Sequence, residues 1–291
     1  MNLDPNIVKI LYILLIVPFA LVMEGIRRKA VARMQNRIGP PITQPIYDIL
    51  KLFQKKKSDT LAQENSFFKV VPFLTFCVAF SFFLFIPLSF ISFKHDFIFL
   101  IYLLVLESAL FVLAGFAGNN PYSAIASMRE LILMVSYEMI FTIIILTLFV
   151  YEEVLMVSEF GAMFMLLKLP IAFICFIAVM AIEIRITPYD TAAAPTEVLE
   201  GVETEYSGKG LAFLHISDAL KLTFFAVLFI YFFFGQFSLP WMLLFVPLAV
   251  VFFSFVQATT GRYRVDQTFK RLTFFLILIL IEFVRIKFIT W

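Results

Sequence analysis

The stretch AIEIRITPYDTAAAPTEVLEGVETEYSGKG, residues 181–210, joins two long apolar runs, 162–182 and 211–234. It carries five glutamates and one aspartate. Each flanking run is long enough to cross the hydrocarbon core of a bilayer as a helix, which takes about 20 apolar residues. A simple membrane linker needs no such concentration of acid. The stretch therefore indicates a place where charge or protons are handled at the mouth of a membrane protein.

The rest of the chain has the same apolar character. Of its 291 residues, 62% are hydrophobic and 39 are phenylalanine. Only helices and closed barrels satisfy their backbone groups within lipid. The first apolar run is too long for a signal peptide and lacks a small-residue cleavage site, so it is expected to remain as a span. The sequence predicts one all-α polytopic membrane domain, 1–291, with eight transmembrane helices at 6–26, 67–91, 97–118, 130–150, 161–182, 211–234, 240–259 and 271–289.

Lysine and arginine are distributed unevenly between the two sides of the membrane. They concentrate in the odd-numbered connections, while the even-numbered ones offer Lys94 and little else. Positively charged loops stay in the cytoplasm. This pattern places both termini outside and predicts four cytoplasmic loops, at 27–66, 119–129, 183–210 and 260–270.

The first of these loops contains a second structural signal. Gly39, Pro40 and Pro41 indicate a turn. After it, apolar residues recur at helical spacing between Ile42 and Phe53, with lysines on the other positions. We expect an amphipathic helix that lies along the membrane surface. A helix that docks a partner would show the same pattern, and the two interpretations do not exclude each other.

Several ionisable residues fall inside the predicted spans. Glu107 lies near the middle of the third span and Lys168 lies within the fifth. Glu130 and Glu138 are eight residues apart, which places them within about 80° of one another around a helix. Charged groups inside a membrane are costly and indicate function by default. The structural alternative is a set of buried ion pairs that hold helices together.

The remaining polar residues of the spans predict less. Asp218 and Lys221 are three residues apart near the start of the sixth span, and we expect them to form a local pair. His215 is one of only two histidines, and Cys77 and Cys175 show no metal-ligand spacing. We expect no metal, haem or other cofactor in this chain.

Five ordered motifs resemble a known family. They are Arg28-Lys29 with Ala32, Gln35, Arg37, Gly39 and Pro40; Asn120-Pro121-Tyr122-Ser123 with Arg129-Glu130 and Ser136-Tyr137-Glu138; Glu183 with Pro188-Tyr189-Asp190 and Glu197; Gly201 with Glu205-Tyr206-Ser207-Gly208; and Arg262 to Gln267. Together they resemble NADH dehydrogenase subunit 1, the complex I subunit at the junction of the peripheral and membrane arms. Its counterpart occurs in membrane-bound [NiFe] hydrogenases.

Four positions depart from the quinone-reducing members of that family. Ile186 stands where an arginine is usual, Ala193 and Pro195 stand where glutamates are usual, and Arg27 replaces another glutamate. The chain is therefore more similar to the hydrogenase branch, or to the related branch that reduces sulfane sulfur. No quinone has to enter these complexes.

The resemblance implies a non-catalytic subunit of an ion-translocating redox complex in a prokaryotic cell membrane. Its partners would be an iron–sulfur small subunit and a [NiFe]-like large subunit on the cytoplasmic side, and antiporter-like subunits in the membrane. Iron–sulfur clusters, and a [NiFe] centre in some complexes, would reside in these partners. The alternatives are the quinone-site subunit of complex I and, from another class, a stand-alone secondary transporter.

Two sets of candidate residues follow from these arguments. The candidates for a proton or coupling path are Glu107, Glu130, Glu138, Lys168, Glu183, Glu197, Glu200, Glu203, Glu205 and Asp218. The candidates for partner docking are Arg28, Lys29, Arg33, Arg37, Tyr189, Asp190, Arg262, Arg264 and Asp266.

Overall fold

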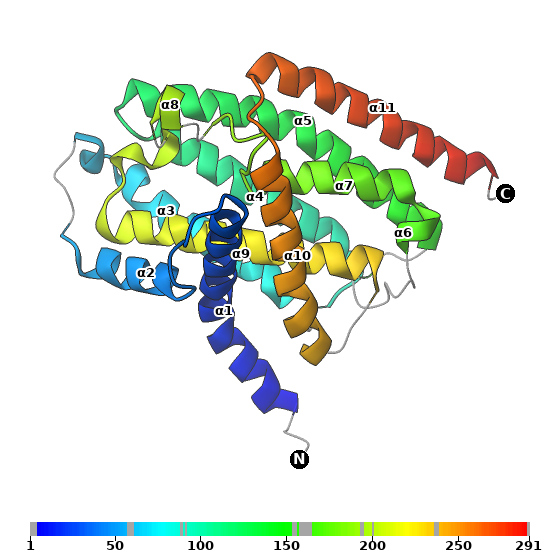
Figure 1. The fold of residues 1–291 in the computed structure, drawn as a ribbon, viewed down its shortest axis with the longest axis horizontal. Helices are drawn as coiled ribbons and strands as arrows, with labels where there is room; N and C mark the ends of the chain where they lie inside the picture. Colours follow the sequence, from blue (N-terminus) through cyan, green and yellow to red (C-terminus); the bar gives the residue numbers. More distant parts are fainter. Residues whose placement is uncertain are drawn as a thin grey trace.

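The computed structural model describes residues 5–56, 61–87, 90, 92–152, 156, 165–192, 195–199, 201–235 and 239–289, and their regular structure is entirely helical. This confirms the all-α prediction for the described part of the chain (Figure 1). The elements in order are α1 (Pro5–Met34), α2 (Gln44–Gln54), η1 (Leu61–Glu64), α3 (Ser66–Ser81), η2 (Phe82–Leu84), α4 (Asp96–Phe116), α5 (Pro121–Glu152), α6 (Met165–Lys168), α7 (Pro170–Glu183), α8 (Pro195–Val198), η4 (Gly201–Glu205), α9 (Gly208–Phe233), α10 (Leu239–Thr259) and α11 (Val265–Ile289).

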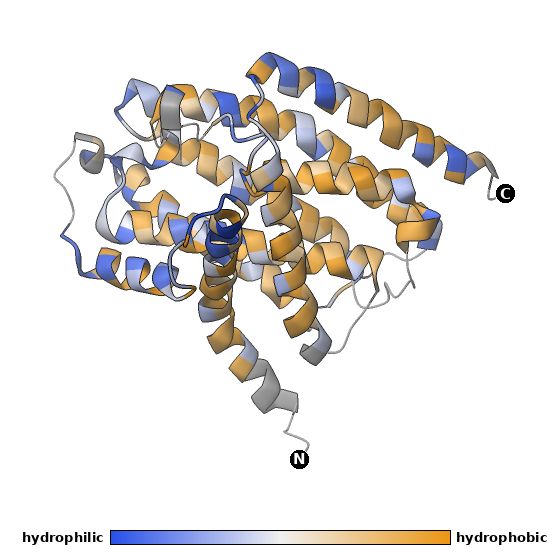
Figure 2. Cartoon of the chain, viewed as in Figure 1, coloured by the Kyte–Doolittle hydropathy of each residue, from blue (hydrophilic) through white to orange (hydrophobic). Residues whose placement is uncertain are grey.

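Each of the eight predicted spans coincides with a long helix or helix pair in the described residues. Five of these helical stretches are long and apolar enough to cross a membrane: α3 with η2, α4, α5, α9 and α10. The crossing of the membrane by α1, by α6 with α7, and by α11 stays a prediction. Figure 2 shows apolar residues along most of the helices, and many large apolar side chains are exposed, as expected of a protein solvated by lipid.

The central element is α9, and most of its residues are buried. Helices α1, α2, α3 and α10 pack around it. Aromatic pairs fill the interfaces, as where the Phe224 and Phe82 ring centroids lie 4.9 Å apart. Large rings suit this role because each buries a large area at a small cost in rotamer entropy. Lys221, near the middle of α9, is therefore held deep in the protein.

Two helices are longer than the hydrophobic pattern predicts. Helix α1 continues through the basic residues to Met34, and α5 begins at Pro121, nine residues before the predicted span. Proline favours the first helical position, and the Asn120 side chain accepts a hydrogen bond from the Tyr122 N–H at 3.0 Å. Most of the segment 119–129, predicted as a loop, is thus the first turns of α5.

A short helix, α2, occupies the segment predicted to be amphipathic. Its residues Pro45, Ile49 and Leu52 are buried, whereas Tyr47 and Leu50 are exposed. The buried side packs on α1 and α9. The helix is present where the sequence predicts it, and its place on a membrane surface stays a prediction.

The fifth predicted span is broken at Leu169, between α6 and α7. Pro170 begins α7, and the free N–H groups of its first turn need partners. Glu282 of α11, which is fully buried, accepts hydrogen bonds from the backbone N–H groups of Ile171, at 3.3 Å, and Ala172. Arg285 bonds the Lys168 carbonyl at 3.1 Å and Glu282 at 3.2 Å. A carboxylate more than 100 residues away thus caps α7, which sequence reasoning missed.

Replacing Glu282 with leucine is expected to destabilise the chain by about 2–4 kcal/mol, because two buried N–H groups lose their acceptor. Glu282→Gln keeps a side-chain carbonyl oxygen and should lose less. Thermal unfolding of the purified protein in detergent measures both. Equal unfolding midpoints for Glu282→Leu and wild type would contradict this role.

Candidate functional site

Four helices bring a buried ionic cluster together in the interior. The ammonium Nζ of Lys221 on α9 lies 2.5 Å from Glu107 Oε2 on α4 and 2.7 Å from Glu183 Oε2 on α7. Lys221 also donates a hydrogen bond to Ser108 Oγ at 3.1 Å, and Tyr137 of α5 donates to the same oxygen at 3.1 Å. All five residues are at most 3% exposed. We call this set, Glu107, Ser108, Tyr137, Glu183 and Lys221, the Lys221 cluster.

The expected local pair of Asp218 with Lys221 is wrong. Asp218 Oδ1 instead lies 2.7 Å from Arg185 Nη1, and Lys221 turns to the glutamates of α4 and α7. The reason is tertiary. Here α9 is packed among other helices, and Asp218 and Lys221 each pair with an oppositely charged side chain from the helix or loop that lies against them.

Arg185, directly after α7, forms the next ionic contact. Its Nε lies 3.0 Å from Glu130 Oε1, and its guanidinium carbon lies 3.2 Å from the Phe111 ring centroid. Burial alone would lower the pKa of Arg185, but the carboxylates of Asp218 and Glu130 outweigh it and raise that pKa. Arg185 also interacts electrostatically with Glu107. The Asp218–Arg185–Glu130 triad is thereby coupled to the Lys221 cluster.

A charged cavity of about 430 Å³ reaches this triad from the loop side. Its lining includes Arg185 and Asp218 together with Glu24, Arg27, Arg28, Glu203 and His215. A second cavity of about 230 Å³ shares Glu24, Arg28, Leu211 and His215 and extends to α2. Ligand atoms of Glu203, His215 and Asp218 lie within 4.8 Å of one another. The guanidinium on Asp218 disfavours a cation there.

Glu138 lies on α5 beyond the Lys221 cluster. It interacts electrostatically with Glu183 and Lys221. Its buried Oε1 has no hydrogen-bond partner among the described residues. A buried carboxylate oxygen without a partner is costly unless it binds a proton or a water molecule. Ionisable groups thus run from the cavity through Arg185 and Lys221 to Glu138.

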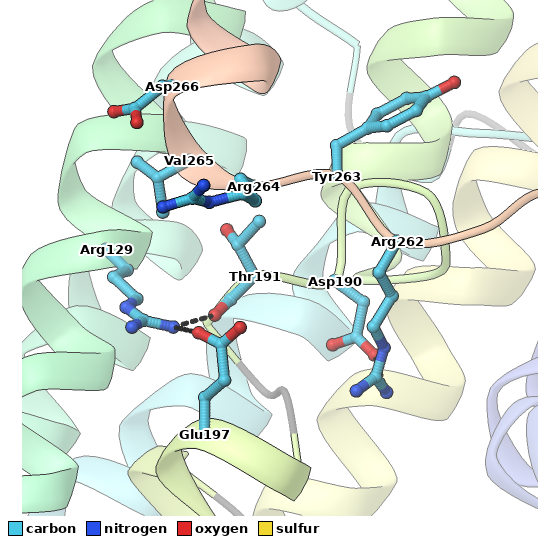
Figure 3. Close-up of a pocket in the computed structure, with 9 residues that line it drawn as sticks. All are labelled: Arg129, Asp190, Thr191, Glu197, Arg262, Tyr263, Arg264, Val265 and Asp266. Carbon is cyan, nitrogen blue, oxygen red and sulfur yellow. Dashed lines mark hydrogen bonds and ion pairs between the residues drawn. The ribbon is translucent and has the colours of Figure 1, made fainter.

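A polar pocket of about 220 Å³ lies where the loop after α7 meets the segment before α11 (Figure 3). Arg129 Nη1 lies 2.5 Å from Glu197 Oε2, and Figure 3 shows these two side chains pointing toward one another. Arg129 also donates a hydrogen bond to the Thr191 carbonyl oxygen at 3.2 Å. Arg262 Nη2 lies 2.7 Å from Asp190 Oδ2. Arg264 and Asp266 complete the rim.

The other sequence candidates have separate places. Arg28 pairs with Glu24 at 2.8 Å, Arg33 and Arg37 are exposed, and Lys29 is half-buried. Tyr189 is buried against the Tyr263 ring, with centroids 5.7 Å apart. Glu205 Oε2 accepts a hydrogen bond from the Asn119 N–H at 2.9 Å. Lys168 lies over the Tyr151 ring at the α6–α7 break, and Glu200 lies outside the described residues.

Asp190 makes the stability of this pocket depend on pH. Burial raises its pKa to about 6, against the opposing charge of Arg262. An unfolded aspartate has a pKa of about 3.9, so between about pH 4 and pH 6 the folded chain binds more protons than the unfolded chain. Stability from this group therefore falls as the pH rises through that window.

Asp190→Asn removes this titration. Relative to the variant, the wild type should be more stable at pH 4 than at pH 7, by about 1–3 kcal/mol. Thermal unfolding at the two pH values measures the difference, with Asp266→Asn as a matched substitution in the same pocket. A wild-type advantage that is the same at both pH values would contradict the assignment.

Comparison with known proteins identifies the family. The family model described as NADH dehydrogenase matches residues 7–287. NADH-ubiquinone oxidoreductase chain 1 of Hyaloraphidium curvatum is 28% identical over 297 residues, 97% of this chain and 96% of its own. A bacterial relative, a subunit of the NADH-quinone oxidoreductase of Bacillus cytotoxicus, is 29% identical over 82% of this chain and 80% of its own.

A solved structure agrees with this assignment. One chain of the membrane-bound sulfane sulfur reductase, an archaeal respiratory membrane complex, superposes with a TM-score of 0.89. It is 25% identical, and the match covers 95% of this chain and 97% of that one. The chain belongs to the NADH dehydrogenase family of membrane proteins.

Proposed function

We propose that this chain is the membrane-anchoring and coupling subunit of an ion-translocating respiratory redox complex. The observation that carries the proposal is the series of buried ionisable groups from the charged cavity to Glu138. Relatives with respiratory names support it. A helix bundle that only anchored a partner would not need this series, because charges inside a membrane are costly.

The coupling follows from the electrostatics of the Lys221 cluster. One cation lies between two carboxylates, so the protonation of either glutamate depends on the other. Inside a protein a change in charge acts at longer range than in water. A redox event that alters charge near the cavity would change the balance at Arg185 and then at Lys221. Glu138 would then transfer a proton to the next subunit. If the coupling ion is sodium, the changed charge of Glu138 would instead move a sodium ion there by electrostatic interaction.

The polar pocket around Arg129 and Arg262 is the proposed docking site for the peripheral arm. It holds three arginines and three acids, which lie on the loops after α7 and before α11, on the short helix α8 and in the first turns of α5 and α11. The partners are an iron–sulfur small subunit and a [NiFe]-like large subunit, with antiporter-like subunits in the membrane. Iron–sulfur clusters and any [NiFe] centre would belong to those partners.

We assign the chain to the hydrogenase or sulfane sulfur reductase type of complex. Arg27 pairs with Glu24 at 2.6 Å and bonds Gln257 at 2.8 Å, so it provides no acid at that position. Ile186 is buried at 2% exposure and offers no charge. The likeness to a sulfane sulfur reductase chain supports the same assignment.

The second candidate is the quinone-site subunit of an NADH:quinone oxidoreductase. The charged cavity favours it, because about 430 Å³ is within the range of small-molecule sites. A quinone analogue that inhibits the purified complex and crosslinks to this chain would establish this candidate and overturn our assignment of the type.

Purification through a tag on this chain tests the proposal itself. Iron–sulfur proteins should co-purify, and charge reversal of the docking pocket by Arg262→Glu should release them. Lys270→Glu, at an exposed position of α11, is the control. A lone chain that transports ions without redox partners would instead establish a stand-alone transporter.

A further inference from the structure

A groove lined by lysine and aromatic residues lies between the first turns of α3 and α9. Its volume is about 170 Å³, and Lys69 and Lys209 lie on its lining. Both helices are long and apolar enough to cross a membrane. Each lysine lies within four residues of the start of its helix, which is the depth at which a span meets the lipid headgroups.

The charged part of the groove is uniformly positive. Both lysines are exposed, and no acidic residue is among the lining residues. The segment directly after α2, which carries Lys55 and Lys56, passes close to the start of α9. A Cβ placed on Gly208 would meet the carbonyl oxygen of Lys55 at 3.0 Å and that of Lys56 at 3.7 Å. Three segments that are far apart in sequence and that each carry lysine therefore meet at the start of α9.

The remainder of the groove is aromatic. Phe68 stacks on Tyr206 with ring centroids 4.1 Å apart. Phe213 lies edge-on to Phe73 at 5.5 Å, and Phe73 is 48% exposed. Cations thus lie at the helix starts, and an apolar surface continues down the spans from them.

We propose that this groove binds an anionic phospholipid, with the phosphate between Lys69 and Lys209 and one hydrocarbon chain along Phe73 and Phe213. Long cationic side chains that begin in an apolar environment extend to the interface and hold anionic headgroups there. The aromatic surface provides contacts for a hydrocarbon chain, which a phospholipid has and a soluble phosphate lacks. The bilayer itself supplies the ligand.

Native mass spectrometry of the purified, detergent-solubilised complex tests the proposal, with phosphatidylglycerol and phosphatidylcholine as probes. Lys69→Gln with Lys209→Gln should weaken phosphatidylglycerol binding about 30-fold, which corresponds to about 2 kcal/mol for two cations. Lys69→Arg with Lys209→Arg should retain it. Lys270→Gln with Lys287→Gln, two exposed lysines of α11, is the matched control.

Three results would overturn the inference. The first is unchanged phosphatidylglycerol binding in the glutamine double variant. The second is equal retention of phosphatidylcholine, or competition by soluble glycerol phosphate as strong as that by the lipid. The third is loss of a protein subunit rather than of lipid in the double variant, which would make the groove a protein-docking surface.

Discussion

Replacing Lys221 with methionine is expected to abolish stable folding of this chain. Methionine fills similar space but leaves the Glu107 and Glu183 carboxylates buried without their cation. Removing one partner of a buried ion pair costs about 3–5 kcal/mol, which is a large fraction of the stability of a typical domain. The amount of assembled complex in the membrane and its thermal midpoint in detergent measure the loss.

A neutralised background separates the charge from the packing. Lys221→Met combined with Glu107→Gln and Glu183→Gln should recover most of the lost stability, because no uncompensated charge remains. Lys270→Met, at an exposed position, is the control. If Lys221→Met assembles as well as this control, the Lys221 cluster does not hold the bundle together.

Replacing Glu138 with glutamine is expected to leave assembly intact and to lower ion transport per electron by roughly tenfold or more, the scale expected when a proton-transfer group is lost. Glutamine keeps the shape and an acceptor oxygen but cannot titrate. Glu138 Oε1 has no hydrogen-bond partner among the described residues, so no such bond gives the residue a structural role. The measurement is ion transport per electron in vesicles at matched assembly.

Glu152→Gln, near the C-terminal end of the same helix, is the control. A purely structural role for Glu138 predicts the opposite pattern, in which Glu138→Gln pumps normally and Glu138→Ala assembles poorly. Normal transport in Glu138→Gln would therefore remove this residue from the coupling path.

The positions of the helices can be predicted because they depend on local composition. A run of about 20 apolar residues needs no tertiary information to be identified. Hydropathy misplaces the start of α5 because Arg129 and Glu130 look like the edge of a span. In the structure Arg129 pairs with Glu197, and Glu130 pairs with Arg185. Charged residues can therefore extend a helix that hydropathy alone would end.

The candidate site is predictable only in part. Glu107, Glu130 and Glu183 stand out as acids within or beside apolar spans, and the structure brings them to the same ionic network. Their partners depend on which helices are neighbours, and spacing along the chain does not contain that information. Proximity in sequence therefore pairs Lys221 with Asp218, which is wrong. Ser108 is next to Glu107 in the sequence and Tyr137 is next to Glu138, and this is the available signal for them.

The cap of α7 has a consequence for biosynthesis. The chain emerges from its N-terminus, so α7 is made about a hundred residues before Glu282 exists to accept its N–H groups. Within lipid those groups have no other good acceptor. The first turn of α7 is therefore capped only after α11 has been made and has packed beside it. Quality-control machinery that samples the nascent chain would encounter an uncapped α7 until α11 has been made.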